Sequence, residues 1–157
     1  TSEEAHLSGN WRVVFFSPME FTFVCPTEIA EFARLEAEFA ASLSASWGGV
    51  WPTFVHLAWR RSNPLLAKVG FPMVADTAGI LAGACGVLTE AGVPRRETFL
   101  IDQDNVIQDV NVTPDSVGRN VEEVLRVAAA ARRGELMACG WRPGDAALDV
   151  EELLATV

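Results

Sequence analysis

The stretch that decides the fold is Pro18-Met19-Glu20-Phe21-Thr22-Phe23-Val24-Cys25-Pro26-Thr27-Glu28. It follows an apolar run at residues 11–16 and precedes a segment in which apolar side chains recur at helical spacing, at Ile29, Phe32, Leu35 and Phe39. The apolar run predicts a buried strand, because both of its faces are apolar. The spacing after it predicts a helix over residues 26–41. The chain therefore has the order strand, turn, cysteine, helix.

The position of Cys25 suggests its chemistry. Pro26 lacks an N–H and favours the first helical position, which puts Cys25 at or next to the N-cap. Unpaired amides and the helix dipole stabilise an anion there. A free thiol with a pKa of roughly 8.5 is only a few per cent ionised at neutral pH, and helix N-termini lower thiol pKa values. Thr22 lies three residues earlier, where its hydroxyl can face the sulfur and hold an incoming oxygen. Spacing alone equally allows a buried structural cysteine.

The residues from Phe15 to Glu28 carry Pro18, Thr22 and Cys25 at the spacing P-x-x-x-T-x-x-C. This motif resembles the active site of the peroxiredoxins, and more narrowly of their typical two-cysteine branch, which includes the catalytic subunits of bacterial alkyl hydroperoxide reductases. Further stretches resemble the same family, at residues 56–60, 71–73, 84–88, 117–126 and 138–141. The resemblance covers most of the chain from Trp11 onward and implies an α/β, thioredoxin-like fold with peroxiredoxin-type additions.

Composition narrows the class of protein. A chain of 157 residues fits one domain. Its formal net charge of −9 argues against nucleic acid and anionic membranes as partners. No apolar run has transmembrane length, and the N-terminus lacks a signal pattern. Three widely spaced cysteines without C-x-x-C do not form a disulfide framework, a zinc site or a thioredoxin-type dithiol. We expect no metal and no cofactor, and the cytoplasm as the compartment.

Further elements follow along the chain. Residues 53–61 are predicted as a helix with Phe54, Leu57 and Ala58 on one face, and residues 71–75 as a strand. A short helix follows, with Ile80, Leu81, Ala84 and Cys85 on one face. Residues 98–102 and 106–112 read as two strands of a hairpin. Asn120 can cap a last long helix that ends at Gly134. We expect a peroxidase domain over residues 1–133 and an irregular tail over residues 134–157, with a turn or two of helix at 150–154.

Two regions depart from the family pattern. At residues 42–52 that pattern has a buried β-branched strand ending in an acidic residue, whereas this chain has Ser, Gly and two Trp. Because Gly48-Gly49 weakens a strand interior, we expect a short or irregular element. Family members also carry a longer lead, with an N-terminal hairpin, before the strand at residues 11–16. The short polar lead here predicts either a fragment or a sheet edge covered differently.

The resemblance also assigns roles to residues. Cys25 would attack the terminal oxygen of a peroxide and become a sulfenic acid. Arg96 would aim cationic donors at the leaving oxygen, since charge develops there. Arg119 would hold Glu28 or the helix start in place. The alternative for each arginine is a surface position, and the adjacent Arg95 is assigned no role.

Cys139 is the candidate resolving cysteine, because the family carries that residue in its C-terminal tail and pairs it with the partner subunit's active site. The commonest resolving position corresponds to Met137 here, and Cys139 matches the second cysteine of relatives with Cys-Ala-Cys. The alternative is an external thiol. Cys85 is predicted to pack in the core, His56 to be structural or interfacial, and Trp141 to pack the tail.

The sequence is compatible with two functions from different classes. The first is a thiol-dependent peroxidase that reduces hydrogen peroxide and organic hydroperoxides to water and alcohols. The resemblance implies that it forms a homodimer able to assemble into a ring, and that a thioredoxin-like or other dithiol protein recycles it. The second is a non-catalytic scaffold or holdase-like protein with the same fold.

Overall fold

The computed structural model describes residues 10–40 and 43–155. The chain divides into two compact units, residues 1–121 and 122–157. The described elements of the first unit are β1 (Trp11–Phe16), α2 (Cys25–Arg34), α3 (Glu36–Ala40), β2 (Leu43–Gly49), α4 (Thr53–Ser62), a 3-10 turn (Pro64–Leu66), β3 (Met73–Ala75), α5 (Ile80–Ala84), β4 (Glu97–Ile101) and β5 (Ile107–Val112). Helix α6 (Val121–Arg133) begins where the units meet in sequence, and α7 (Val150–Ala155) lies in the second.

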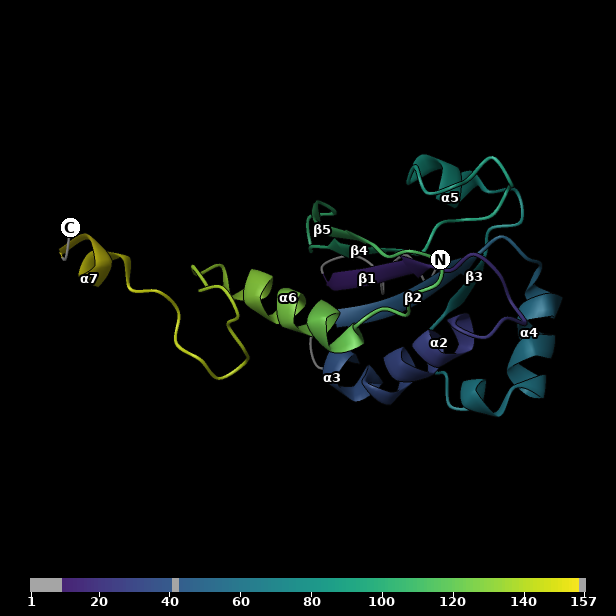
Figure 1. The fold of residues 1–157 in the computed structure, drawn as a ribbon, viewed down its shortest axis with the longest axis horizontal. Helices are drawn as coiled ribbons and strands as arrows, with labels where there is room; N and C mark the ends of the chain where they lie inside the picture. The colour runs from purple at the N-terminus through teal and green to yellow at the C-terminus, as the bar shows by residue number, and fades with distance from the viewer. Residues whose placement is uncertain (1–9, 41–42, 156–157) are drawn as a thin grey trace. The chain divides into compact units, whose positions relative to one another are not determined.

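One five-stranded sheet, in the order β3-β2-β1-β4-β5, forms the centre of the first unit (Figure 1). Strand β1 pairs in parallel with β2 and antiparallel with β4. Strands β4 and β5 form the antiparallel hairpin that the sequence predicts. The buried strand at residues 11–16 is likewise confirmed, because β1 has a neighbour on each side. This mixed sheet with its helices is the predicted α/β class.

The two phenylalanines at the end of β1 direct the helices to opposite faces of the sheet. Phe15 stacks on Phe32 of α2, with ring centroids 3.9 Å apart. Phe16 meets the edge of Phe99 at 6.1 Å and packs in a buried cluster with Ala82 of α5. Because successive side chains of a strand point to opposite faces, α2 covers one face and α5 the other. Cys25 therefore begins a helix that packs against the preceding strand through the contact between Phe32 and Phe15.

Residues 43–49 form a regular strand, so the prediction of a short or irregular element was wrong there; residue 42 lies outside the described residues. Strand β2 pairs in parallel on both sides, with β1 and with β3. Gly48 and Gly49 of this strand let neighbouring side chains lie close to its backbone. A Cβ on Gly48 would lie 2.8 Å from Cε1 of Phe16, and one on Gly49 would lie 2.5 Å from Cη2 of Trp47. The ladder on both sides outweighs the low strand propensity of glycine.

The predicted helix over residues 26–41 is also corrected. Helix α2 ends at Arg34 and α3 begins at Glu36, while residue 41 lies outside the described residues. Leu35 between them has φ −91° and ψ 5°, which leaves the α region although its side chain is buried. Leucine is a good helix former, so the sequence carries no signal for this break.

In the short helices α4 and α5, the face that is buried differs from the apolar face that the sequence predicts. In α4 the buried side chains are His56 and Trp59, while Phe54 is 83% exposed. In α5 the buried side chain is Ala82, and Ile80 is 75% exposed. Apolar spacing identified both helices but not the side that faces the protein. None of the helices among the described residues is long and apolar enough to cross a membrane.

In the second unit, the segment after α6 is organised around Trp141, which is buried. Its indole Nε1 donates to the carbonyl of Asp145 at 3.0 Å, and Arg126 Nη1 donates to the Trp141 carbonyl at 3.2 Å. The guanidinium of Arg133 lies over the ring, 5.9 Å from its centroid. The predicted packing role of Trp141 therefore holds within this unit. Helix α7 matches the predicted helical turns at residues 150–154.

We expect Gly48→Ala to lower the free energy of unfolding by about 1–3 kcal/mol, because the added methyl overlaps the buried Phe16 ring. Urea unfolding followed by circular dichroism measures the change. Gly83→Ala is the matched control: it lies in α5 with nothing within 4 Å of the new Cβ, so stability should stay constant or rise by up to about 1 kcal/mol. Equal urea midpoints for wild type and Gly48→Ala would contradict the close-packing explanation.

Candidate active site

Cys25 occupies the first position of α2, directly after the N-cap Val24, as the sequence predicts. The Val24 side chain makes no capping hydrogen bond, and Pro26 supplies no N–H. The cysteine side chain is 1% exposed. The sulfur therefore lies at the N-terminal end of a ten-residue helix, where the helix dipole is positive.

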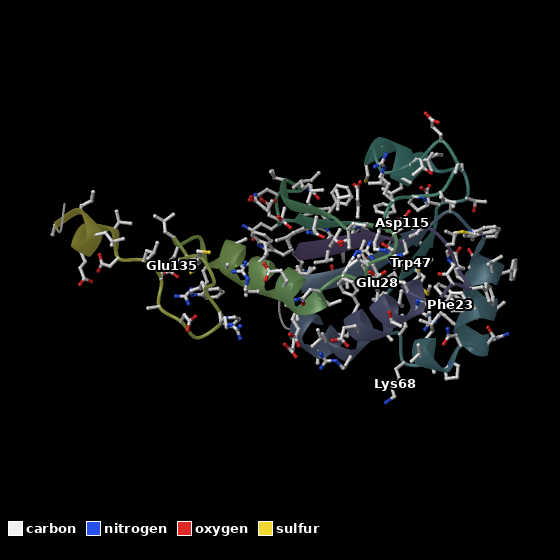
Figure 2. The ribbon with its side chains drawn as sticks, viewed as in Figure 1. Phe23, Glu28, Trp47, Lys68, Asp115 and Glu135 are labelled. Atoms are coloured by element: carbon white, nitrogen blue, oxygen red, sulfur yellow. The ribbon has the colours of Figure 1, made fainter. Side chains whose placement is uncertain are left out.

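Arg96 lies immediately before β4 and brings positive charge to this sulfur. Its Nη2 is 3.7 Å from Cys25 Sγ and also donates to the Asp115 carbonyl at 3.0 Å. Its Nη1 donates to the carboxylate of Glu28. Figure 2 labels Glu28 and Asp115, the two partners that fix the guanidinium. Arg96 is buried, so its planar fork is held at the sulfur by packing as well as by hydrogen bonds.

Glu28 connects the cysteine helix to both arginines. It lies three residues after Cys25, on the same side of α2. Besides Arg96, it accepts a hydrogen bond from the backbone N–H of Arg119 at 2.8 Å and from Arg119 Nη1 at 3.1 Å. The carboxylate is buried, and its charge is compensated by two guanidinium groups.

Arg119 ties this ion-pair group to the sheet. Its Nη2 donates to the carbonyl of Phe16, at the end of β1, and to the carbonyl of Glu97 at 3.0 Å, at the start of β4. Its guanidinium also lies 5.5 Å from the centroid of the Phe15 ring. Burial lowers the pKa of Arg119 to about 10, and the Glu28 carboxylate opposes this shift. Arg119 is therefore charged at neutral pH.

Pro18 and Thr22 lie in the loop that joins β1 to α2, and both are half-buried. The Thr22 hydroxyl donates to the Met19 carbonyl at 3.0 Å, which closes a turn. A hydroxyl that donates its proton still has lone pairs with which to accept a hydrogen bond. Within this turn Phe21 has φ 54°, a left-handed conformation that is rare for a bulky residue. The loop before Cys25 is thus held in a specific, strained shape.

The other two cysteines have different surroundings. Cys85 is half-buried against the cluster of Phe16, Ala82, Val87 and Phe99. Burial raises the pKa of its thiol, with Asp76 and Glu97 adding to the shift, so its thiolate is disfavoured. Cys139 is exposed and lies in the second unit. Arg95 is exposed and lines a cavity of about 300 Å³ with Thr89, Val112, Thr113, Pro114 and Asp115.

Sequence reasoning missed two features near the site. The first is the carbonyl of Asp115, which accepts a hydrogen bond from Arg96. It is a backbone group, so no pattern of side chains in the sequence predicts its role. Glu20 was passed over, although it is a buried acidic residue inside the motif and its carboxylate oxygen Oε1 lies 3.1 Å from Nε2 of His56. An acidic residue between two apolar neighbours, Met19 and Phe21, was the signal available for it.

A cysteine at a helix start, beside an arginine fixed by a buried carboxylate and on a sheet of this topology, defines a thiol-chemistry protein of the thioredoxin-like class. A model of the AhpC/TSA family matches residues 1–110. The chain is 49% identical to alkyl hydroperoxide reductase C of Mycolicibacterium smegmatis over 148 residues. This match covers 94% of this chain and 76% of that protein.

Solved structures agree with this match. AhpC of Mycobacterium bovis has a TM-score of 0.81 at 46% identity, with 88% of this chain and 78% of that chain covered. A yeast mitochondrial 1-Cys peroxiredoxin, studied for its thiol resolving mechanism via glutathione/thioredoxin systems, has a TM-score of 0.82 at 30% identity, with 90% and 74% covered. The chain belongs to the AhpC/TSA family, among the typical two-cysteine peroxiredoxins. It is a thiol-dependent peroxidase with an antioxidant role, and the non-catalytic scaffold is not favoured.

We expect Glu28→Gln to lower the free energy of unfolding by about 3–5 kcal/mol, because it leaves two buried guanidinium groups without their counter-charge. The control is Glu31→Gln on the same helix, where an exposed pair with Arg34 is removed and the loss should stay under about 1 kcal/mol. Urea unfolding of the three proteins measures both. Equal losses in the two variants would show that the buried carboxylate is not the anchor of the site.

Proposed function

We propose that Cys25 is the peroxidatic nucleophile of this enzyme. The observation that carries the assignment is the 3.7 Å separation between Cys25 Sγ and Nη2 of Arg96, at the start of α2. The thiolate attacks the terminal oxygen of a hydroperoxide, the O–O bond breaks, and the sulfur is oxidised to a sulfenic acid. The other oxygen takes a proton and leaves as water or an alcohol.

Arg96, Thr22 and Pro18 complete the proposed catalytic group. The leaving oxygen gains negative charge as the O–O bond breaks, and the fixed Arg96 guanidinium stabilises that charge. Thr22 accepts a hydrogen bond from the peroxide, and Pro18 shapes the loop without offering a competing N–H. Glu28 and Arg119 act as supporting residues, because they hold Arg96 and the helix start.

We further propose that Cys139, in the tail at residues 134–157, resolves the sulfenic acid of the partner subunit. Its thiol attacks the Cys25 sulfur, water leaves, and an intersubunit disulfide forms. A thioredoxin-like or other dithiol protein then reduces that disulfide and becomes oxidised itself. The exposure of Cys139 supports this role, since the thiol is open to a partner. Resolution by an external thiol remains the competing proposal.

One equivalent of hydrogen peroxide, followed by alkylation, a non-reducing gel and peptide mapping, tests these assignments. We expect wild type to give a disulfide-linked dimer that contains a Cys25–Cys139 peptide. The dimer should disappear in Cys25→Ser and Cys139→Ser. It should persist in Cys85→Ser, the matched control, because Cys85 is half-buried with a raised thiol pKa.

The other outcomes are equally informative. Cys25 recovered as a sulfenic or sulfinic acid without a dimer would refute Cys139 and favour an external thiol. Cys25 recovered as a free thiol, with peroxide still consumed, would refute Cys25 as the nucleophile.

The exposed surfaces of the first unit support a homodimer that assembles into a ring. Strand β5 is an edge of the sheet, and its side chains are mostly exposed, so a second copy can pair with it. Phe54 and Leu57 form an exposed apolar stripe on α4, whose Trp59 meets the ring of Phe21. We assign dimerisation to β5 and ring closure to this α4 stripe. A cycle that ends in thiol reduction suits a reducing compartment, and we propose the cytoplasm.

Sedimentation velocity of reduced protein tests the assembly. We expect Phe54→Glu to convert a ring into dimers, because it places a charge in the apolar contact. Ile80→Glu is the control, since Ile80 is similarly exposed but lies on α5, on the other face of the sheet. A ring that survives Phe54→Glu unchanged would exclude the α4 stripe as its interface, and a fall to monomers would implicate it in dimerisation.

A further inference from the structure

A second buried polar group lies outside the Cys25–Arg96–Glu28 cluster. Nε2 of His56 on α4 is 3.1 Å from Oε1 of Glu20, with both side chains almost fully buried. The edge of the His56 ring meets the ring of Trp47, labelled in Figure 2, at a centroid distance of 4.9 Å. A Cβ on Gly49 would lie 2.7 Å from Glu20 Oε1. The glycine at the end of β2 thus makes the space for this carboxylate.

Burying this polar group costs free energy of folding. Both carboxylate oxygens of Glu20, both ring nitrogens of His56 and Nε1 of Trp47 are buried without an aligned hydrogen bond to another described residue. A buried polar atom without an aligned hydrogen bond destabilises the folded protein, because it has lost its bonds to water. Apolar side chains would fill the same volume at lower cost, so packing alone does not account for an acid and an imidazole here.

The location of Glu20 indicates what the group does. Glu20 and Phe21 are the two central residues of the turn that the Thr22 hydroxyl closes onto the Met19 carbonyl. Phe21 is held in its left-handed conformation while its ring meets Trp59 at 6.1 Å. Such a conformation persists only where its surroundings enforce it.

One face of α4 holds both of these side chains. His56 and Trp59 are three residues apart and therefore lie on the same side of the helix. His56 holds Glu20, and Trp59 contacts Phe21. The turn that presents Thr22 is therefore clamped by α4 at two consecutive residues, while the Cys25 sulfur is governed separately by Arg96 and Glu28.

We propose that Glu20 and His56 are positioning residues that hold the Met19–Thr22 turn, and with it the Thr22 hydroxyl, in the shape that receives the peroxide at Cys25. The inference rests on the proposed roles of Cys25 and Thr22. Neither Glu20 nor His56 acts on the sulfur. The pair sets the pose of the peroxide, whereas the arginine–carboxylate group lies against the Cys25 sulfur itself.

Two rates separate these effects in reduced protein. The first is the rate at which hydrogen peroxide oxidises Cys25, and the second is the rate at which iodoacetamide alkylates it, which needs the thiolate but not the peroxide cradle. We expect Glu20→Gln and His56→Gln each to slow peroxide oxidation by about 10- to 100-fold, because a misplaced catalytic group costs rates of that order. Alkylation should stay unchanged or become faster as the turn loosens.

Three further variants sharpen the experiment. The double variant should be no slower than the slower single variant, because the two residues act as one unit. Glu20→Asp, which keeps the charge, should recover part of the peroxide rate. Glu31→Gln, an exposed carboxylate on α2, should change neither rate. Circular dichroism confirms folding, and if Glu20→Gln fails to fold, His56→Gln and Glu20→Asp carry the comparison.

The outcomes that overturn the proposal are distinct from failure of the proposed function. A parallel fall of both rates would mean that the pair acts on the Cys25 thiol or on the fold as a whole. An unchanged peroxide rate in both single variants would reduce the pair to packing. Wild-type Cys25 that does not react with peroxide would refute the peroxidatic assignment itself, whatever the variants do.

Discussion

The site depends on one buried carboxylate shared by two buried guanidinium groups. Glu28 accepts from Arg96 and Arg119, and these arginines reach the Asp115, Phe16 and Glu97 carbonyls, so one ionic group joins α2, β1 and the start of β4. Two guanidinium groups and one carboxylate leave an excess positive charge in a poorly solvated place. The Cys25 sulfur lies 3.7 Å from Nη2 of Arg96, one of these two groups. The ionic group that joins α2 to the sheet therefore also places positive charge beside the cysteine.

The loop before Cys25 is governed by a different part of the protein. Glu20 and Phe21 rest on His56 and Trp59 of α4, and the end of β2 is shaped to admit them. Gly48 makes room for the Phe16 ring on one face of the sheet, and Gly49 makes room for Glu20 on the other. The unusual Trp47-Gly48-Gly49 sequence is thus matched to its neighbours rather than being a weakened strand.

Several elements were predictable because their signal is local. Strand β1, the β4–β5 hairpin and the start of α2 follow from an apolar run, a turn signal and Pro26. The predictions that failed concern non-local causes. Strand β2 is stabilised by hydrogen-bonded pairing with β1 on one side and β3 on the other, and its own residues do not predict this pairing. The break at Leu35 has no glycine or proline to mark it, and the buried side of α4 is set by Trp47 and Glu20.

The sequence by itself determined the class of the fold, the cysteine at a helix start and, through its motif, the family and its chemistry. Through the same motif it singled out Arg96 rather than the adjacent Arg95, and it placed Arg119 at Glu28 or the helix start. Only the tertiary structure decided how these groups are held: Arg96 is buried against Cys25 and Glu28 and donates to the Asp115 carbonyl, while Arg95 is exposed. It also brought Glu20 to His56. The physical reason is that helix starts and strand periods arise between near neighbours in sequence. The pairing of buried charges depends on which distant segments the sheet brings together.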